Sequence, residues 1–387
     1  MLLGDLGAEV IKIERLGTGD ETRLWAPPEI NGQSCYFVCC NRNKKSVALN
    51  IKKSEGRDIA VELAKRSDVL VENFVPGNMD KLGLGYSKLR SLNPKLIYCS
   101  ITGYGSDGPY KKRGGYDVIA AAVGGLLHIT GQEDGPPSKA GVALTDLATG
   151  LYAKGAIMTA LFQRERNGLG QKIDCNLLST QVASLVNIGS NFLNAGVEAK
   201  RWGTSHESIV PYQAFKTLDG YLIVGAGSDS LFQDLCKILE KPELAENEKY
   251  CNNASRVKNR KDLIDLLSKI FEQKSNKDWM DLFVASGSSI PVGPVNTIEE
   301  VFRDPQVQFN AQVQQLQHPA AGTFKVVGPA VSFSDSVNKC RTAPPLLGEH
   351  TDQVLQEILS MNENELSQLA RDHVIERYQG QKGIGKL

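Results

Sequence analysis

One acidic residue, Asp146, stands where a loop of small residues is predicted to become a helix. Small and apolar residues recur at helical spacing from Gly150 to Leu161, which is typical of a buried helix that packs closely on its neighbours. The free N–H groups and the dipole at the start of a helix stabilise an anion there. A carboxylate held in this way stays ionised at neutral pH and can act as a helix cap or as a nucleophile.

The composition is that of an ordinary globular protein. The chain has 387 residues, of which 41% are hydrophobic and 23% charged, and its formal net charge is zero. A chain of this length is expected to form two domains, or one large domain with a smaller one inserted. It has no basic surplus for nucleic acid and no apolar run long enough to cross a membrane. We therefore expect neither nucleic acid nor a membrane as a partner.

The eight cysteines predict neither a disulfide framework nor a metal site. They form no Cys-x-x-Cys pair and have no histidine nearby at zinc-ligand spacing. We therefore expect a reducing intracellular compartment, thiols that fill the core, and no bound metal. We recognise no signal or transit peptide at Met1.

Strands and helices alternate through the first half of the chain. Val47–Ile51, Asp68–Phe74 and Lys95–Thr102 are predicted as strands, and Glu55–Arg66 has the spacing of an amphipathic helix. This order predicts an α/β fold with a parallel sheet. Further elements are expected at residues 9–13 (strand), 118–127 (helix), 171–175 (strand) and 177–193 (helix).

The pattern changes near residue 200. Residues 211–216 and 221–225 predict a hairpin around an Asp-Gly turn, and helices and a turn at 291–296 follow it. We assign residues 1–200 and 311–387 to a large domain, and residues 205–310 to a small α+β domain. A second hairpin is expected within 312–327, a helix at 362–371, and a disordered basic tail at 377–387.

Seven short motifs occur together in the order in which one protein family has them. They are Gly7–Arg15, Asn41–Ser46, Asp68–Phe74, Gly114–Asp117, Thr145-Asp146, Pro211–Phe215 and Ala343–Thr351. Over nearly the whole chain they resemble the class III CoA-transferases, the formyl-CoA and carnitine type. The resemblance implies a Rossmann-like large domain, an inserted small domain and an interlocked homodimer. It also implies that the first strand of the fold is missing from this sequence.

The resemblance places Asp146 at the position of the family's nucleophile. It implies that Asp146 forms an anhydride with an acyl group and then a thioester with CoA. The expected donor is succinyl-CoA, and the expected acceptor is a dicarboxylate such as glutarate or hydroxymethylglutarate. CoA thioesters would then be substrates, and no cofactor is expected to stay bound. The family's relatives imply a mitochondrial location.

Several other positions match the family's CoA contacts. They are Arg15, Leu49, Lys52, Asn73, Phe74, Lys81, Leu82, Arg113 and Tyr116. The cations would meet the phosphates of CoA and the apolar groups its adenine and pantetheine, although each residue alone could be a surface charge or part of the core. Gly225 and Gly227 match a mobile glycine-rich loop whose N–H groups could stabilise an oxyanion, and they could equally form a simple turn.

Two alternatives remain open at this point. The same fold houses α-methylacyl-CoA racemases, which use a His and an Asp to move a proton. Their histidine corresponds to Tyr116, whose phenol is a poor base at neutral pH. The second alternative is a truncated CoA-binding protein without catalysis, since the missing strand would carry part of the CoA pocket.

Overall fold

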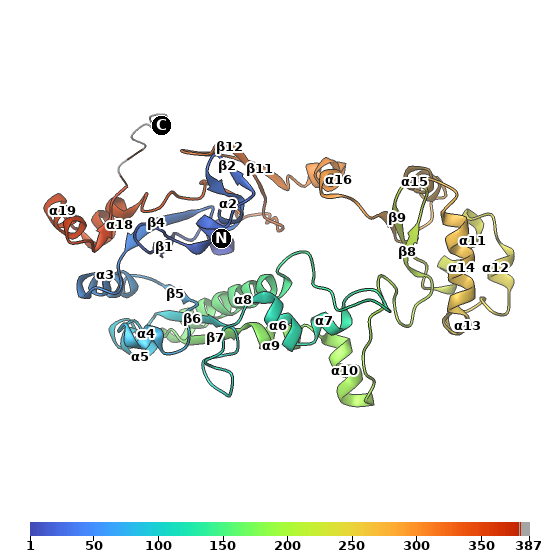
Figure 1. Ribbon diagram of the computed structural model, residues 1–387, viewed down its shortest axis with the longest axis horizontal. Coiled ribbons are helices and arrows are strands. Elements are labelled where there is room, and N and C mark those ends of the chain that lie inside the picture. The colour runs from blue at the N-terminus through green and yellow to red at the C-terminus, as the bar shows by residue number, and fades with distance from the viewer. Residues whose placement is uncertain (379, 381–387) are drawn as a thin grey trace. The chain divides into compact units, whose positions relative to one another are not determined.

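The computed structural model describes residues 1–378 and residue 380, and these form two compact units. Unit 1 comprises residues 1–120 and 143–184 and the chain from residue 302 onward, and unit 2 comprises residues 121–142 and 185–301. Figure 1 labels the elements of both. The α/β class predicted from the sequence is confirmed, since helices cover one wholly parallel and one mixed sheet in unit 1. The division into domains at residues 200 and 310 stays a prediction.

One sheet of unit 1 joins the two ends of the chain. Its strands, in order, are β1 (Val10–Glu14), β4 (Lys44–Leu49) and β13 (Ile375–Glu376), with β1 parallel and β13 antiparallel to β4. Apolar side chains of Val47 and Leu49 pack with three helices. These helices are α3 (Ser54–Lys65), α18 (Thr351–Leu359) and α19 (Glu363–Arg371).

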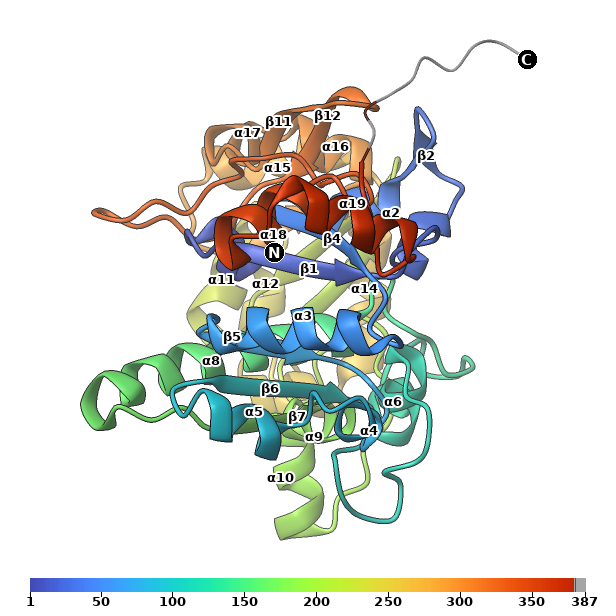
Figure 2. The ribbon, with the colours of Figure 1, turned by 90° about the vertical axis from the view of Figure 1, so that its left-hand side faces the viewer.

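The second sheet of unit 1 is wholly parallel. Its strands, in order, are β5 (Val69–Glu72), β6 (Ile97–Thr102) and β7 (Lys172–Asn176). Tyr98 packs with α3 and α5 (Tyr86–Leu92) on one face, and Cys99 packs with α8 (Leu144–Asn167) on the other. Figure 2 shows these helices on opposite sides of the sheet.

Helix α8 is buried along one side only. Ala153, Ile157 and Ala160 pack on the sheet, whereas Leu151 and Phe162 on the other side are 58% and 59% exposed. The sequence predicted a buried helix that packs closely on its neighbours, and in the single chain this holds for one side only. The physical reason is that the parallel sheet covers one side of α8, and no element in the described part of unit 1 covers the other.

The remaining elements of unit 1 are mostly short, and the sequence analysis predicted some of them and missed others. They are α1 (Leu2–Asp5), a short 3-10 helix (Glu21–Leu24), β2 (Glu29–Ile30), β3 (Gln33–Ser34), α2 (Cys35–Cys40), α4 (Asn78–Lys81), α9 (Leu177–Ala183), α16 (Ile298–Arg303, at the boundary), α17 (Pro305–Phe309), and the predicted hairpin of β11 (Val313–His318) and β12 (Gly322–Val327).

Two predicted helices are each broken into two. Residues 118–127 form α6 (Asp117–Val123) and α7 (Leu126–Ile129), because Gly125 takes a left-handed conformation between them. Residues 177–193 form α9 and α10 (Val186–Ala195), with Val186 at a positive φ of 46°. The predicted disordered tail lies mostly outside the described residues.

The Asn-Arg-Asn motif at 41–43 has a structural role. The Arg42 guanidinium donates to both carboxylate oxygens of Asp5 at 2.8 and 2.9 Å, and to the Val327 carbonyl at 2.7 Å. Asn43 Nδ2 donates to Asp5 Oδ1 at 2.8 Å. Arg42 is 2% exposed and Asp5 is fully buried, so this pair ties the first helix of the chain to β12 in the interior of unit 1.

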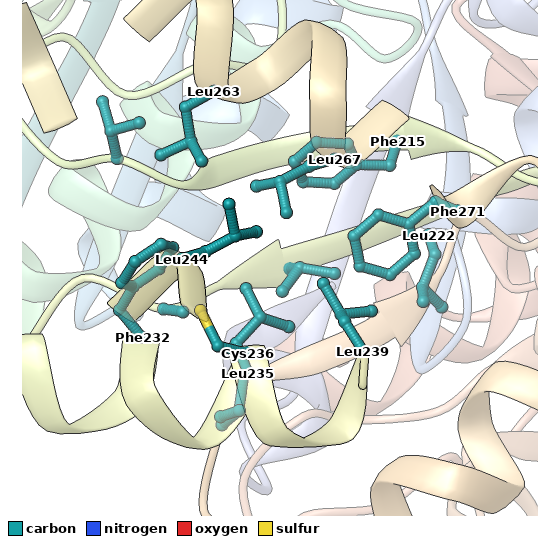
Figure 3. Close-up of a cluster of buried hydrophobic side chains, with 14 of the residues drawn as sticks. Phe215, Leu222, Phe232, Leu235, Cys236, Leu239, Leu244, Leu263, Leu267 and Phe271 are labelled. Atoms are coloured by element: carbon teal, nitrogen blue, oxygen red, sulfur yellow. The ribbon is translucent and has the colours of Figure 1, made fainter. Parts of the chain in front are cut away.

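Unit 2 is a small α+β unit. The predicted hairpin is confirmed as β8 (Tyr212–Lys216) and β9 (Tyr221–Gly225), and the segment predicted as a turn contains a third antiparallel strand, β10 (Val292–Pro294). Helices α11 (Asp229–Ile238), α12 (Glu243–Glu246), α13 (Asn253–Lys258), α14 (Arg260–Phe271) and α15 (Asn276–Ala285) surround the core drawn in Figure 3.

Candidate active site around Asp146

Asp146 is the third residue of α8, and its carboxylate does not cap the helix. Asp117, the first residue of α6, takes that place: its Oδ1 accepts hydrogen bonds from the N–H groups of Thr145 at 2.8 Å and Asp146 at 3.1 Å. Within the described residues, the Asp146 carboxylate accepts no hydrogen bond, and Asp146 is exposed. Its side chain is therefore available for chemistry.

Buried hydroxyl groups hold the first turn of α8 in place. Thr145 donates from Oγ1 to Gln181 Oε1 of α9 at 2.8 Å, and Thr149 donates from Oγ1 to the Thr145 carbonyl at 2.7 Å. All three of these residues are buried. The backbone of Asp146 is thus fixed from inside the unit, while the exposed carboxylate forms none of the anchoring bonds.

Two effects raise the pKa of Asp146 above its ordinary value. Partial burial of the carboxyl group is the larger, and the negative charge of Asp117 adds to it. This direction is opposite to the one expected for a carboxylate at a helix start, because the helix N–H groups bond to Asp117 instead. A more basic carboxylate is a better nucleophile once it is ionised.

Tyr36 of α2 belongs to the same neighbourhood, and the sequence analysis missed it. Burial raises the pKa of the Tyr36 phenol, and the charges of Asp146 and Asp117 raise it further. The rings of Tyr36 and Trp25 meet edge to face with their centres 4.8 Å apart. Both line a cavity of about 460 Å³, here called the aromatic cavity. Its lining is Trp25, Ala26, Pro27, Pro28, Cys35, Tyr36 and Cys39.

The nine residues predicted to contact CoA all lie in unit 1. Eight of them fall in the segments that follow the carboxyl ends of β1, β4, β5 and β6, and Leu49 is the last residue of β4. Figure 2 shows the arrows of β1 and β6 pointing the same way. Ligands of open parallel sheets bind beyond this edge, so the arrangement is suitable for a large cofactor-like substrate such as CoA.

The predicted apolar contacts differ in how much surface they offer. Phe74 is 42% exposed and Tyr116 is 71% exposed, so both rings are open to a ligand. Asn73 is also exposed, and Leu82 is half-buried. Leu49, the last residue of β4, is 2% exposed and packs in the core between that strand and its helices, so its side chain offers no surface in this conformation.

The predicted cations are all at the surface. Arg15 Nη2 lies 3.5 Å from Glu21 Oε1 in an exposed ion pair, and the Arg113 guanidinium stacks on the Tyr110 ring at 3.8 Å. Lys52 and Lys81 are exposed. Exposed Arg and Lys side chains such as these can turn toward a phosphate at a small cost in free energy, because no buried contact holds them.

Gly225 and Gly227 lie in unit 2, where Gly225 is the last residue of β9 and Gly227 lies between β9 and α11. The N–H of Gly225 donates to the Pro291 carbonyl, and that of Ala226 donates to Pro211, both at 2.9 Å. In this conformation the N–H groups of Gly225 and Ala226 are both occupied and cannot stabilise an oxyanion. A Cβ at Gly227 would lie 2.6 Å from Ile209, so close packing accounts for that glycine.

A second cavity in unit 1, of about 410 Å³, lies on the Tyr98 face of the parallel sheet. Glu72 and Val75, which flank Asn73 and Phe74, contribute to it, together with Lys111, Lys112 and Lys172 at the rim. None of the nine residues predicted to contact CoA lines this cavity. The role of those nine residues in binding CoA therefore stays a prediction, separate from this cavity.

Comparison with known proteins settles the family, since residues 1–351 match CoA-transferase family III. The chain belongs to this family. A human protein named succinyl-CoA:glutarate CoA-transferase is 52% identical over 98% of this chain and 86% of its own length. A succinate–glutarate CoA-transferase of Agrobacterium fabrum is 39% identical over 92% of this chain and 90% of its own. The motif-based resemblance is confirmed.

Solved structures of similar proteins have the same fold. The crystal structure of a CAIB/BAIF family protein from Brucella suis superposes with a TM-score of 0.83 at 39% identity, covering 92% of this chain and 93% of that one. Rv3272 from Mycobacterium tuberculosis gives 0.80 at 30% identity, covering 91% and 92%. The CoA-transferase described here is thus an enzyme of a family whose substrates are CoA thioesters.

The described residues offer neither a metal centre nor a membrane-spanning helix. They contain no group of three or more His, Cys, Asp or Glu side chains placed to hold a metal ion. None of their helices combines the length and the apolar character needed to span a bilayer.

Proposed function

We propose that this CoA-transferase moves CoA from succinyl-CoA to glutarate or to a close dicarboxylate such as hydroxymethylglutarate, with Asp146 as the covalent carrier. The names of the human, mouse and Agrobacterium relatives support this donor and acceptor. The single observation that carries the role of Asp146 is its exposed, unpartnered carboxylate on an anchored helix start. A relative at 37% identity is named for oxalate, so the acceptor acid varies at greater distance within the family.

The proposed reaction begins with two carbonyl substitutions on the donor side. A carboxylate oxygen of Asp146 attacks the thioester carbonyl of succinyl-CoA, which breaks the C–S bond and gives an aspartyl–succinyl anhydride and CoA thiolate. The thiolate then attacks the aspartyl carbonyl of the anhydride, which releases succinate and leaves CoA on Asp146 as a thioester. The activated acyl bond is conserved throughout, provided that water is excluded.

The acceptor side repeats the same two steps. A glutarate carboxylate attacks the aspartyl thioester, which expels CoA thiolate and forms an aspartyl–glutaryl anhydride. The thiolate attacks the glutaryl carbonyl, and glutaryl-CoA leaves as the Asp146 carboxylate is restored. Through these steps we assign Arg15, Lys52 and Lys81 to the phosphates of CoA, and Phe74 to its adenine. Their positions beyond the strand ends support this assignment.

We also propose the interlocked homodimer that the family resemblance implies. The open side of α8 supports it, because Leu147, Leu151, Tyr152 and Phe162 are all more than half exposed. A row of large apolar side chains on a single-chain surface marks an interaction site. Sedimentation equilibrium should give twice the mass of 42.2 kDa calculated for one chain, and a purely monomeric species would refute the dimer.

The mitochondrial location belongs to the same proposal and rests on the family resemblance alone. Fractionation of cells that make the protein would test it, since recovery outside the mitochondrial fraction would be a direct contradiction.

Trapping the covalent intermediate tests the proposed mechanism. The protein is incubated with succinyl-CoA, quenched and digested, and the peptide that carries Asp146 is analysed by mass spectrometry. We expect a CoA thioester on Asp146 that disappears in the Asp146→Asn variant. An unmodified peptide in a protein that still binds CoA would point to proton transfer at the α carbon or to binding without catalysis, and the covalent mechanism would fail.

The charge of Asp117 gives a pH-dependent prediction. Asp146 must be ionised to attack, so activity falls as the pH drops through its pKa, and the raised pKa places this fall at a higher pH. In Asp117→Asn the amide oxygen still accepts the N–H bonds, but the second cause of the raised pKa is gone. In a plot of kcat/KM against pH, the fall on the acidic side (the acidic limb) should therefore move to lower pH. Asp58→Asn, at an exposed position of α3, should leave the limb in place, and an unmoved limb in both variants would contradict the assignment.

A further inference from the structure

The second cavity of unit 1, of about 410 Å³, has no part in the proposed function, because neither Asp146 nor any residue assigned to CoA lines it. One face of β6 presents Tyr98, Ser100 and Thr102 to this cavity. Cys99 points to the opposite face and packs in the core, as expected for the cysteines, although the exposed Cys39 shows that this expectation is wrong for part of the set. The strand therefore offers the cavity three side chains that carry hydroxyl groups.

Ser100 holds a hydroxyl group that has no partner in the chain. The residue is 4% exposed, and its side chain makes no hydrogen bond within the described residues. No side-chain oxygen or nitrogen that is sealed in their interior lacks a partner, so the Ser100 hydroxyl must reach the cavity instead. A polar group in such a buried position is normally paired, which points to a ligand in the cavity.

One end of the cavity is cationic. Lys111 and Lys112 come from the loop after β6, and Lys172 is the first residue of β7. None of the three forms an ion pair within the described residues, and Lys172 Nζ lies 3.4 Å from Ser106 Oγ of the same loop. Asp107 of this loop also lines the cavity, so the three lysines outnumber the nearby lining carboxylate. Three amines without carboxylate partners suit an anionic group of a ligand.

The other end is acidic and aromatic. Glu72 ends β5, Asp80 lies in α4, and the rings of Tyr86 and Tyr98 meet edge to face with their centres 5.8 Å apart. Burial raises the pKa of the Tyr98 phenol, and the charges of Glu72 and Asp80 raise it further, so both carboxylates lie near that phenol. Glu72 Oε2 accepts the N–H of Phe74 at 2.8 Å, which leaves Oε1 without a donor in the described chain. Carboxylates beside aromatic rings suit an ammonium group.

We infer that this cavity binds a small zwitterion whose ammonium group and carboxylate are separated by a chain of several methylene groups. The ammonium group binds at Glu72 and Asp80, the carboxylate binds at the three lysines, and the Ser100 hydroxyl lies on the strand between the two ends. Because β5 and β7 flank β6, the backbones of Glu72 and Lys172 are at least about 10 Å apart. A zwitterion with adjacent charges is too short to reach both ends. The inference does not depend on the proposed function.

The zwitterion 6-aminohexanoate is the probe for the test, which titrates it into the full-length protein at neutral pH in a calorimeter. Hexanoate lacks the amine, hexylamine lacks the carboxylate, and glycine lacks the separation between them. We expect saturable binding of one 6-aminohexanoate per chain, at least about tenfold tighter than any of the other three compounds. Saturating CoA should leave this affinity unchanged, because the predicted CoA contacts lie outside the cavity.

Variants at the two ends should each remove one half of this selectivity. In Glu72→Gln/Asp80→Asn, 6-aminohexanoate should bind no tighter than hexanoate, an expected loss of about tenfold. The glutamine at position 72 can still accept the Phe74 N–H, so the turn after β5 is kept. In Lys111→Gln/Lys112→Gln, the preference over hexylamine should fall by a similar factor.

Ser100→Ala should weaken binding of 6-aminohexanoate by about fivefold and leave both preferences in place, since it removes a hydrogen bond and no charge. Asp58→Asn and Lys261→Gln, at exposed positions outside the cavity, are the matched controls and should change nothing. Hexanoate binding as tightly as 6-aminohexanoate would reduce the cavity to a plain anion site and overturn the inference. Displacement of the probe by CoA, or no saturable binding of the probe, would overturn it as well.

Discussion

Replacing Asp146 with asparagine is expected to lower kcat/KM for CoA transfer from succinyl-CoA to glutarate by about 10⁴-fold or more, the scale on which covalent enzymes lose activity with their nucleophile. An amide oxygen cannot form the anhydride. CoA binding should be retained, because the predicted CoA contacts belong to other segments and the Asp146 carboxylate anchors none of them. Thermal stability should be equal or slightly higher, because the variant no longer places two carboxylates at one helix start.

The measurement is an initial-rate comparison with calorimetric titration of CoA and a melting curve for each variant. Asp146→Ala is made in parallel, because slow deamidation of an asparagine would restore a trace of the native enzyme. Asp58→Asn, which removes an exposed carboxylate from α3, is the control and should retain full activity. A variant that keeps more than about a tenth of the rate would show that Asp146 is not the covalent carrier.

The sequence located Asp146 but could not show what surrounds it. The prediction of a helix start was right because small residues, a single carboxylate and helical spacing are local signals. The partner Asp117 lies 29 residues earlier in the chain, and its hydrogen bonds to the helix N–H groups depend on tertiary packing. Tyr36 comes from a different segment and belongs to no spacing pattern. The aromatic cavity therefore became visible only with the structure.

The fold was predictable where burial repeats regularly along the chain. Buried strands such as Ile97–Thr102 and the hairpin at residues 212–225 came out of residue patterns that are local. Short elements such as α2 and α4 were missed because four to six residues do not establish a period. The breaks near Gly125 and Val186 depend on left-handed residues inside helical patterns, and a side of α8 expected to be buried proved open.

Replacing Arg42 with methionine is expected to lower the free energy of unfolding of unit 1 by about 3–5 kcal/mol. The Arg42–Asp5 pair lies in the interior, so the variant leaves the Asp5 carboxylate buried without its countercharge. The Val327 carbonyl also loses its donor. Methionine has a similar length and no charge, so the change isolates the electrostatic loss from a loss of volume.

Hydrogen exchange can follow this effect separately in each unit. Peptides from β4 and β12 should lose protection in Arg42→Met, whereas peptides from β8 and β9 in unit 2 should keep theirs. Adding Asp5→Asn should restore part of the protection, because the uncompensated charge is then removed and only the hydrogen bonds remain lost. Lys277→Met, which breaks an exposed ion pair with Asp281 on α15, is the control and should cause no measurable change. Equal losses in β4 and β8 would mean that Arg42 stabilises more than unit 1, and unchanged protection in β4 would mean that the buried pair adds nothing to its stability.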